Sequence, residues 1–426
     1  MRPANPERTL LTVIGALYLA QGISFGLVVE ALPALLRAGG VPLELIALVP
    51  MAMLPWMVKV VWAPLVDNRG GRRLGRRRGW ILPTQGLLVA ALLGVAAVPF
   101  DADGAVAIIA LLGVACLAAC TQDIATDGLA AERLGRPRMA LANTLQVGGM
   151  MAGMLVGGAG MMVLADLIGV SGALSAMAGL IALTAIPVLL WREPPPVARQ
   201  TPTKARLRGF FRNRRGWALA VVALVFANGH SVSSGLSRLL LIDLDWSLAR
   251  VGVVVGSGNA LAIILGAGLA GSAVRAWGAV PASVVGLLVL LLAQTLWLVA
   301  ADAAPLPLWL AMTATLGGGI GSGMVSVAVF TLAFRFAHDG GQAGTDMTMV
   351  QCLHGLGGMV MTAAATALVA RTGFVWGFGL GVGCSLLALA AILLTRRLCE
   401  PERFPTPAPT NQEANQEANQ EECPAQ

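Results

Sequence analysis

The chain is divided by charged or proline- and glycine-rich breaks into twelve apolar stretches, each long enough to cross a lipid bilayer as a helix. A crossing helix needs ~20 predominantly apolar residues, because each residue rises ~1.5 Å and the hydrocarbon core is ~30 Å thick. The stretches begin near residues 9, 44, 79, 104, 138, 171, 216, 250, 280, 305, 344 and 373. Only 12% of the 426 residues are charged and 57% are hydrophobic, which excludes a soluble globular domain of this size. The sequence therefore predicts an all-α polytopic membrane protein with twelve transmembrane helices.

Most of the 29 lysine and arginine residues fall in alternate connections between these stretches. When the amino terminus is assigned to the cytoplasm, the outer connections hold only Arg37, Arg238, Arg250 and Arg371. Connections rich in lysine and arginine stay on the cytoplasmic side of a membrane. We therefore expect both termini in the cytoplasm, and we attribute the net charge of +7 to this topology and not to nucleic-acid binding.

A basic, proline-rich connection at residues 191–215 divides the chain into two sets of six stretches. Short matches recur between the sets at nearly one separation: Ala20-Gln21-Gly22-Ile23-Ser24 with Ala227-Asn228-Gly229-His230-Ser231, and Gln146 to Met154 with Gln351 to Met359. Such internal similarity is typical of duplicated membrane bundles. We expect pseudo-symmetric six-helix bundles at 1–190 and 216–397, a cytoplasmic basic linker at 191–215 and a disordered cytoplasmic tail at 398–426, whose polar repeat cannot bury a core.

Two acidic residues, Asp123 and Asp127, lie deep inside the fourth stretch. Asp123 is ~15 Å from the end marked by Arg133, and residues at i and i+4 share one helix face. A charge at that depth costs at least ~2.5 kcal/mol and normally faces a bundle interior or a water-filled cavity. Two ionised carboxylates would repel there, so we expect the pair to hold a proton at least part of the time. The alternative is a structural ion pair between helices, with Lys59 as the partner.

A second charged motif, Asp67-Asn68-Arg69-Gly70-Gly71-Arg72-Arg73, lies between the second and third stretches. A carboxylate and guanidinium groups at the cytoplasmic ends of adjacent helices can form charge-assisted hydrogen bonds that hold one face of a bundle shut. We predict a cytoplasmic gate made of Asp67, Arg69, Arg72 and Arg73. The alternative is that these arginines only anchor the topology.

Other polar side chains inside the stretches are candidates to line a substrate cavity between the two bundles. We predict this role for Gln21, Lys59, Gln122, Gln146, Asn228, His230, Gln351 and His354. Glu30, near the outer end of the first stretch, is a further candidate for proton coupling beside Asp123 and Asp127. The six cysteines show no CxxC spacing, and we expect no metal site and no cofactor. Glycine-rich runs such as Gly148 to Gly160 indicate close helix approach and not phosphate loops.

Two parallel repeats with this loop motif resemble the major facilitator superfamily. Three runs are similar to its muropeptide permease and acetyl-CoA transporter branch: Trp62-Ala63-Pro64-Leu65-Val66-Asp67, Leu74-Gly75-Arg76-Arg77-Arg78-Gly79-Trp80 and Thr121-Gln122-Asp123-Ile124-Ala125-Thr126-Asp127-Gly128. Within that branch, further runs look most like siderophore importers of the rhizobactin and pyochelin type: Tyr18-Leu19-Ala20-Gln21-Gly22, Glu30-Ala31-Leu32-Pro33 and Leu54-Pro55-Trp56 with Lys59. The likeness is dense over about residues 15–130 and diffuse afterwards.

The resemblance implies a permease of the bacterial inner membrane, not an enzyme. It would import a ferric siderophore from periplasm to cytoplasm by alternating access, as a proton-coupled symporter and as a monomer. Its partners would be a small-molecule substrate, protons and the lipid bilayer. Two alternatives remain open, a permease for peptidoglycan fragments or another bulky anionic metabolite, and a siderophore exporter. Paired aspartates also serve intramembrane proteases, but the second aspartate is then expected on a different helix.

Overall fold

The computed structural model describes the chain except residues 1–5, 47, 71–73, 195–203, 303–304 and 400–426. Almost all of the tail that the sequence predicts to be disordered, and Arg72 and Arg73 of the predicted gate, lie outside the described residues. The first half contains α1 (Pro6–Gly26), η1 (Leu27–Ala31), α2 (Leu32–Ala38), α3 (Leu43–Ile46), η2 (Val49–Met53), α4 (Leu54–Val58), η3 (Lys59–Val61), α5 (Ala63–Asn68), α6 (Arg78–Ala96), α7 (Ala105–Arg133), α8 (Arg136–Leu155), η4 (Val156–Gly160), α9 (Met161–Ile168) and α10 (Val170–Leu190).

The second half follows the same pattern of long helices. It contains α11 (Leu207–Phe210), α12 (Arg214–Val225), α13 (Asn228–Asp243), α14 (Leu248–Val251), η5 (Gly252–Ser257), α15 (Gly258–Trp277), α16 (Ala279–Ala300), α17 (Leu308–Gly340), α18 (Ala343–Thr372) and α19 (Phe374–Cys399). Of the labelled η elements, η1, η4 and η5 are π-helical, and they interrupt the helical spans that begin with α1, α8 and α14.

Within the described ranges, eleven helical spans are long and apolar enough to cross a membrane. The second of the twelve predicted stretches is the exception, because short α and 3-10 pieces replace one helix between Leu43 and Asn68. Prolines 50, 55 and 64 explain the breaks, since proline lacks an amide hydrogen and its ring clashes with the preceding turn. The pieces still run together along α7, which contacts α3, η2, α4 and α5. The protein is therefore all-helical and multi-pass, with one segmented span.

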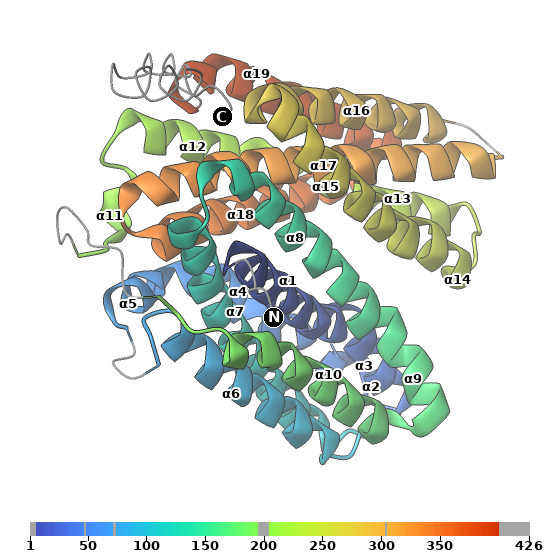
Figure 1. The fold of residues 1–426 in the computed structure, drawn as a ribbon. Coiled ribbons are helices and arrows are strands. Elements are labelled where there is room, and N and C mark those ends of the chain that lie inside the picture. Colours follow the sequence, from blue (N-terminus) through green and yellow to red (C-terminus); the bar gives the residue numbers. More distant parts are fainter. Residues whose placement is uncertain (1–5, 47, 71–73, 195–203, 303–304, 400–426) are drawn as a thin grey trace, which may run out of the picture.

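The helices form two groups that correspond to the two halves of the chain. In the first group α1 contacts α8 and α10, and in the second α16 contacts α17 and α19. Between the groups α8 contacts α15 and α17, and α18 contacts α5 and α7. Figure 1 shows the groups converging at the end that carries α5 and α11 and diverging toward α9 and α14. We refer to the first of these as the Asp67 end and to the other as the opposite end.

Glycines bring α1 and α8 into backbone contact. A Cβ atom added to Gly153 would lie 2.7 Å from Gly22 Cα and 2.7 Å from Ile23 N. A Cβ on Gly22 would in turn lie 2.9 Å from Gly153 Cα. Small residues drive helix association in lipid by permitting such close approach, as the glycine-rich run in the sequence indicates.

Gly153→Ala should therefore destabilise the first group of helices, because the added methyl group meets backbone that cannot turn away. We expect a loss of about 1–3 kcal/mol, in the range of overpacked cores, seen as a lower midpoint of thermal unfolding in detergent. Gly148→Ala on the same helix is the matched control, since nothing lies within 4 Å of its added Cβ. Equal midpoints for the two variants would contradict the predicted contact.

Candidate functional site

A buried ion pair lies between the segmented span and α7. Lys59, the first residue of η3, donates from Nζ to Asp123, and the two side chains are only 2% and 4% exposed. The same ammonium group donates to Gln351 Oε1 of α18 at 2.5 Å and lies 4.6 Å from the centroid of the Trp56 ring. Asp123 is therefore paired with Lys59, the partner expected if the acid forms a structural ion pair between helices. Lys59 also connects this pair to the second half.

Asp127, one turn along α7, has a different set of partners. Its carboxylate accepts hydrogen bonds from the hydroxyl of Tyr18 on α1, from Gln146 Nε2 on α8 at 3.1 Å and from Gln351 Nε2 at 2.6 Å. It is fully buried among these helices and does not face lipid. Gln351 thus touches both charged partners, accepting from Lys59 and donating to Asp127.

The charges of this cluster do not balance when both acids are ionised. Lys59 carries one positive charge and the two carboxylates carry two negative charges, so a proton on Asp127 would make the buried group neutral. A buried uncompensated charge is costly, whereas a hydrogen-bonded neutral group is tolerated. Protonation of Asp127 would therefore remove the excess negative charge of the cluster.

The structure brings together five of the predicted residues: Lys59, Asp123, Asp127, Gln146 and Gln351. Tyr18 completes the cluster and was missed as a site residue, although it is the only tyrosine in the chain. A phenol is an unusual group to bury beside a carboxylate unless it bonds to it. Its uniqueness in an apolar span was the signal available in the sequence.

Other predicted site residues lie elsewhere. Gln122 donates to Gln85 of α6 inside the first group, and Gln21 is fully buried with no partner for its amide among the described residues. His354 stacks on Phe226, with ring centroids 4.6 Å apart. The others are distributed as follows: Asn228 is buried on α13 against Gly357, His230 lines a cavity inside the second group, and Glu30 is exposed on η1 toward the opposite end.

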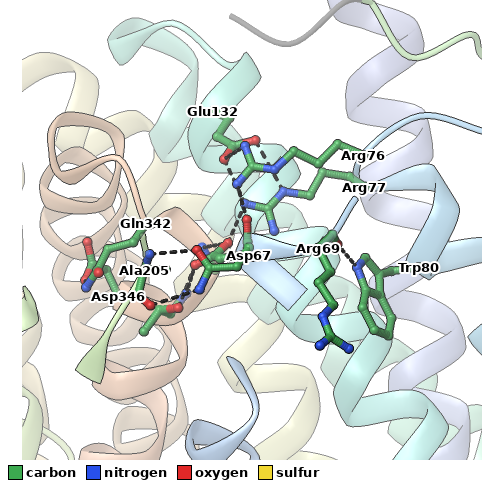
Figure 2. Close-up of polar contacts among 12 residues, drawn as sticks. Asp67, Arg69, Arg76, Arg77, Trp80, Glu132, Ala205, Gln342 and Asp346 are labelled. Atoms are coloured by element: carbon green, nitrogen blue, oxygen red, sulfur yellow. Dashed lines mark hydrogen bonds and ion pairs between the residues drawn. The ribbon is translucent and has the colours of Figure 1, made fainter. Parts of the chain in front are cut away.

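Asp67, at the end of α5, joins the two halves at the Asp67 end (Figure 2). Its carboxylate accepts hydrogen bonds from Arg77 at 2.6 Å, from the Thr345 amide at 2.7 Å and from the Thr345 hydroxyl at 2.6 Å. The Gly344 amide lies 3.2 Å away as a further donor. Because Gly344 and Thr345 begin α18, this carboxylate ties the first turn of that helix to the first half.

The arginine that pairs with Asp67 is not one of those predicted. Arg77 is fully buried and also binds Glu132 of α7 at 2.7 Å, whereas the Arg69 side chain points away from Asp67 (Figure 2). The reason is local, because Arg69 follows α5 in an extended conformation, with φ −110° and ψ 114°. Its carbonyl accepts from the Trp80 indole at 2.5 Å. The loop that returns to α6 brings Arg77 back to the carboxylate instead.

The pKa values at this end follow from the same contacts. Burial acts to raise the pKa of Asp67, but the Arg77 guanidinium and the two bonds from Thr345 outweigh it and hold that pKa below its ordinary value. Burial acts to lower the pKa of Arg77, and the carboxylates of Asp67 and Glu132 raise it above its ordinary value. Both groups are therefore ionised over the physiological range, and together they form a charge-assisted pair.

Further hydrogen bonds between the halves lie at the level of Asp127 or closer to the Asp67 end. Asn143 on α8 donates to Thr331 on α17 at 3.1 Å, and Thr144 donates to the Ala267 carbonyl at 3.1 Å. His338 Nδ1, at the end of α17, lies 2.7 Å from the Ala131 carbonyl. These contacts, with the divergence of the helices in Figure 1, describe a molecule closed at the Asp67 end. Within the described ranges, no three His, Cys, Asp or Glu residues gather as a metal site.

Solved structures of transporters share this arrangement of helices. The human organic anion transporter MFSD10 (TETRAN) superposes with a TM-score of 0.73 at 16% identity, covering 91% of this chain and all of that one. A bacterial homologue of the iron transporter ferroportin, in its outward-facing state, superposes with a TM-score of 0.68 at 15% identity over 92% of this chain and 99% of the other. The chain has the major facilitator fold. At these identities the likeness establishes the fold alone.

Sequence comparisons find relatives that are named as permeases or transporters. The family model described as acetyl-coenzyme A transporter 1 matches residues 10–167. The anhydromuropeptide permease of Escherichia coli (strain K12) is 29% identical over 272 residues, which are 62% of this chain and 54% of that protein. The putative transporter AmpG 3 of Rickettsia prowazekii (strain Madrid E) is 24% identical over 349 residues, 77% of this chain and 79% of that one.

These matches support part of what the sequence motifs imply. The resemblance to the muropeptide permease and acetyl-CoA transporter branch is confirmed as a likeness, and the matched family region contains Lys59, Asp123 and Asp127. The chain spans about half the length of the E. coli permease that it matches. The closer likeness to siderophore importers stays a prediction.

Proposed function

We propose that this major facilitator protein is a secondary transporter of a bacterial inner membrane that imports a bulky anionic metabolite, a peptidoglycan fragment of the anhydromuropeptide class. The observation that carries the mechanism is the Gln351 bridge, in which one side chain of α18 contacts both Lys59 and Asp127 of the other half. The substrate class is supported by the similarity to the anhydromuropeptide permease of E. coli.

We propose that the Asp67 end faces the cytoplasm, with both termini on that side, because basic residues concentrate at this end. They are Arg76, Arg77, Arg78, Arg206, Arg208, Arg212, Arg214 and Arg215. In this orientation the conformation described above is closed toward the cytoplasm. The two bundles at 1–190 and 216–397, joined by the linker at 191–215, are the bodies that would rock against each other.

Opening of the Asp67 end requires the first turn of α18 to leave Asp67, and we propose that the Gln351 contacts break in the same movement. Lys59 would then lose one acceptor and Asp127 one donor. A carboxylate of the solute could compete with Asp123 for Lys59, and a proton could neutralise Asp127. A ligand shifts such an equilibrium only by its different affinity for the two states. Because opening breaks the Gln351 bridge, the affinities of Lys59 for the solute anion and of Asp127 for a proton would differ between the closed and the open state.

Uptake into inside-acid or inside-alkaline membrane vesicles tests the proposal. We expect a labelled anhydromuropeptide to accumulate when the exterior is more acidic, and we expect accumulation to collapse when a protonophore removes the gradient. A panel of ferric siderophores serves as the comparison set, with vesicles lacking the protein as the blank. Gradient-driven uptake of a ferric siderophore without uptake of the anhydromuropeptide would overturn the proposed substrate class and favour the prediction from the first two stretches.

A further inference from the structure

A group of exposed arginines lies at the Asp67 end of the second group of helices, where α11 turns into α12. Arg208, Arg212 and Arg214 are exposed there, and their side chains make no hydrogen bond or ion pair within the described part of the chain. We call these three side chains the arginine surface. The segment that carries it, residues 204–217, contains no aspartate or glutamate. Its positive charge is therefore available to a partner from outside the chain.

The first half shows that basic residues at this end need not stay unpaired. Arg76 and Arg77 bind Glu132, and Arg77 also binds Asp67 (Figure 2). Their charges are used in contacts within the protein. Membrane topology requires only that basic residues lie on the cytoplasmic side, and either arrangement satisfies that requirement. The lack of acids in the segment that carries the arginine surface is therefore a separate feature, which topology does not explain.

The backbone under the arginine surface is held in place on both sides of the turn. Phe210 is fully buried, and its ring packs against Phe336 of α17 with centroids 5.2 Å apart. The Asn213 side chain accepts from the Gly216 amide at 2.8 Å and so caps α12. The partial positive charge at the start of this helix has the same sign as the arginines. Binding at this surface therefore does not have to order a free loop first.

An exposed face of α12 continues from the arginine surface. It consists of Arg214, Trp217, Val221 and Leu224. These residues follow one another at intervals of three or four, so they share one side of the helix. The Phe211 ring lies 4.7 Å from the Trp217 ring, which holds the turn against this side. Charge is followed by an aromatic ring and then by aliphatic side chains, the order of headgroup, interface and acyl chain in a bilayer leaflet.

We propose that the arginine surface binds the headgroup of an anionic phospholipid whose acyl chains lie along the exposed face of α12. Guanidinium groups form charge-assisted, often bidentate hydrogen bonds with phosphate oxygens. Clusters of basic residues next to a membrane helix attract anionic lipids. A free phosphate ion would use the arginines and leave the apolar face unused, so a phospholipid matches more of the surface. The lipid would bind here whatever solute the protein carries.

Native mass spectrometry of the purified full-length protein in detergent tests the proposal. The probes are dioleoylphosphatidylglycerol, which is anionic, and dioleoylphosphatidylcholine, which has the same acyl chains and no net charge. We expect adducts of phosphatidylglycerol at concentrations at which phosphatidylcholine binds weakly, and we expect a large excess of inorganic phosphate to leave them in place. Equal binding of the two lipids, or displacement by inorganic phosphate, would overturn the proposal.

A triple variant, Arg208→Gln with Arg212→Gln and Arg214→Gln, assigns the binding to this surface. A basic residue near a membrane surface strengthens the attraction of anionic lipid about fivefold. The affinity for phosphatidylglycerol should therefore fall about a hundredfold in this variant, while the weak binding of phosphatidylcholine should not change. An unchanged preference for phosphatidylglycerol would overturn the proposed site.

The matched control is a second triple variant, Arg69→Gln with Arg192→Gln and Arg275→Gln. It removes the same charge from three exposed arginines that lie at or just past the ends of α5, α10 and α15. Because these arginines stand on separate elements, we expect the preference for phosphatidylglycerol to persist. An equal loss in the two triple variants would show a general attraction by net charge and would overturn the site.

Unfolding midpoints in detergent separate lipid binding from folding. All six substituted arginines are exposed, so both triple variants should unfold at the midpoint of the parent protein when lipid is absent. Phosphatidylglycerol should raise the midpoint of the parent protein and of the control variant, because a ligand that binds only the folded state stabilises it. It should leave the midpoint of the arginine-surface variant unchanged. A rise of equal size in all three proteins would contradict the assignment.

Discussion

Replacing Asp123 with asparagine should abolish accumulation of solute driven by a pH gradient. The substitution removes the carboxylate that pairs directly with Lys59, and the buried ammonium group then keeps Gln351, the Trp56 ring and the more distant charge of Asp127. Breaking a buried pair by removing one partner costs about 3–5 kcal/mol. Gradient-driven uptake by the single variant should therefore fall to the level of vesicles without the protein, measured as initial rate and as plateau.

A loss of stability could by itself produce that result, so the double variant Lys59→Gln with Asp123→Asn is needed. It removes both charges and leaves amides that can bond to each other and to Gln351. We expect its unfolding midpoint in detergent to recover toward that of the parent protein while gradient-driven uptake stays absent. Asp166→Asn, exposed on α9, is the control for loss of an acid outside the cluster. Normal gradient-driven uptake by the double variant would show that the Lys59–Asp123 pair is structural and is not needed for coupling.

Asp67→Asn should open the Asp67 end. The carboxylate holds Arg77 and the first turn of α18 together, and asparagine can keep neither the charge pairing nor all of the acceptor contacts. Truncating one side of a buried charge pair costs about 2–5 kcal/mol, enough to change a closed population into a mainly open one. Spin labels at the exposed positions Arg69 in the first half and Ala276 at the end of α15 in the second half should report a longer distance by pulsed electron resonance.

The matched control for this variant is Asp339→Asn. Asp339 binds Arg215 at 3.0 Å, with side chains 36% and 24% exposed, and both residues belong to the second half. Exposed pairs contribute about 0–1 kcal/mol, so the distance between the labels should not change. An unchanged distance in Asp67→Asn as well would show that this carboxylate does not hold the halves together.

The pH dependence of this end follows from the lowered pKa of Asp67. A carboxylate whose pKa is depressed in the closed state stabilises that state fully above its ordinary pKa, and the stabilisation is lost as pH falls through the depressed value. The part of the closure that depends on Asp67 should thus be constant from about pH 5 to 8 and be lost only in strong acid, which is measured as the change in label distance that Asp67→Asn causes at each pH.

Much of the fold was predictable because lipid leaves few options for an apolar chain. The long stretches predict the eleven long spans, and the placement of Asp123 and Asp127 away from lipid follows from the cost of charge. The segmented second span was not predicted, because the length of an apolar stretch does not show that several prolines together divide it into short helical pieces. Similarly, the sequence grouped Asp67 with Arg69, Arg72 and Arg73 and did not identify its partner Arg77, because backbone direction after α5 is not visible in residue spacing.

The candidate site shows the same limit: relations within one helix were predictable, and contacts between helices were not. Residues within one helix, such as Asp123 and Asp127, were paired by their spacing, and Lys59 was named as an alternative partner, but spacing could not show which groups on other helices bond to each acid. Lys59 takes Asp123, while Tyr18, Gln146 and Gln351 take Asp127. Gln122 and His354 were grouped with them on polarity alone, and only packing shows that one faces Gln85 and the other stacks on Phe226.

The bond from Tyr18 to Asp127 has a practical consequence, because the chain contains one tyrosine. Biosynthetic incorporation of fluorotyrosine would place a single fluorine nucleus in the whole molecule, directly beside this carboxylate. The chemical shift of that nucleus would then follow the ionisation of Asp127 in membranes, without any engineered cysteine or attached dye.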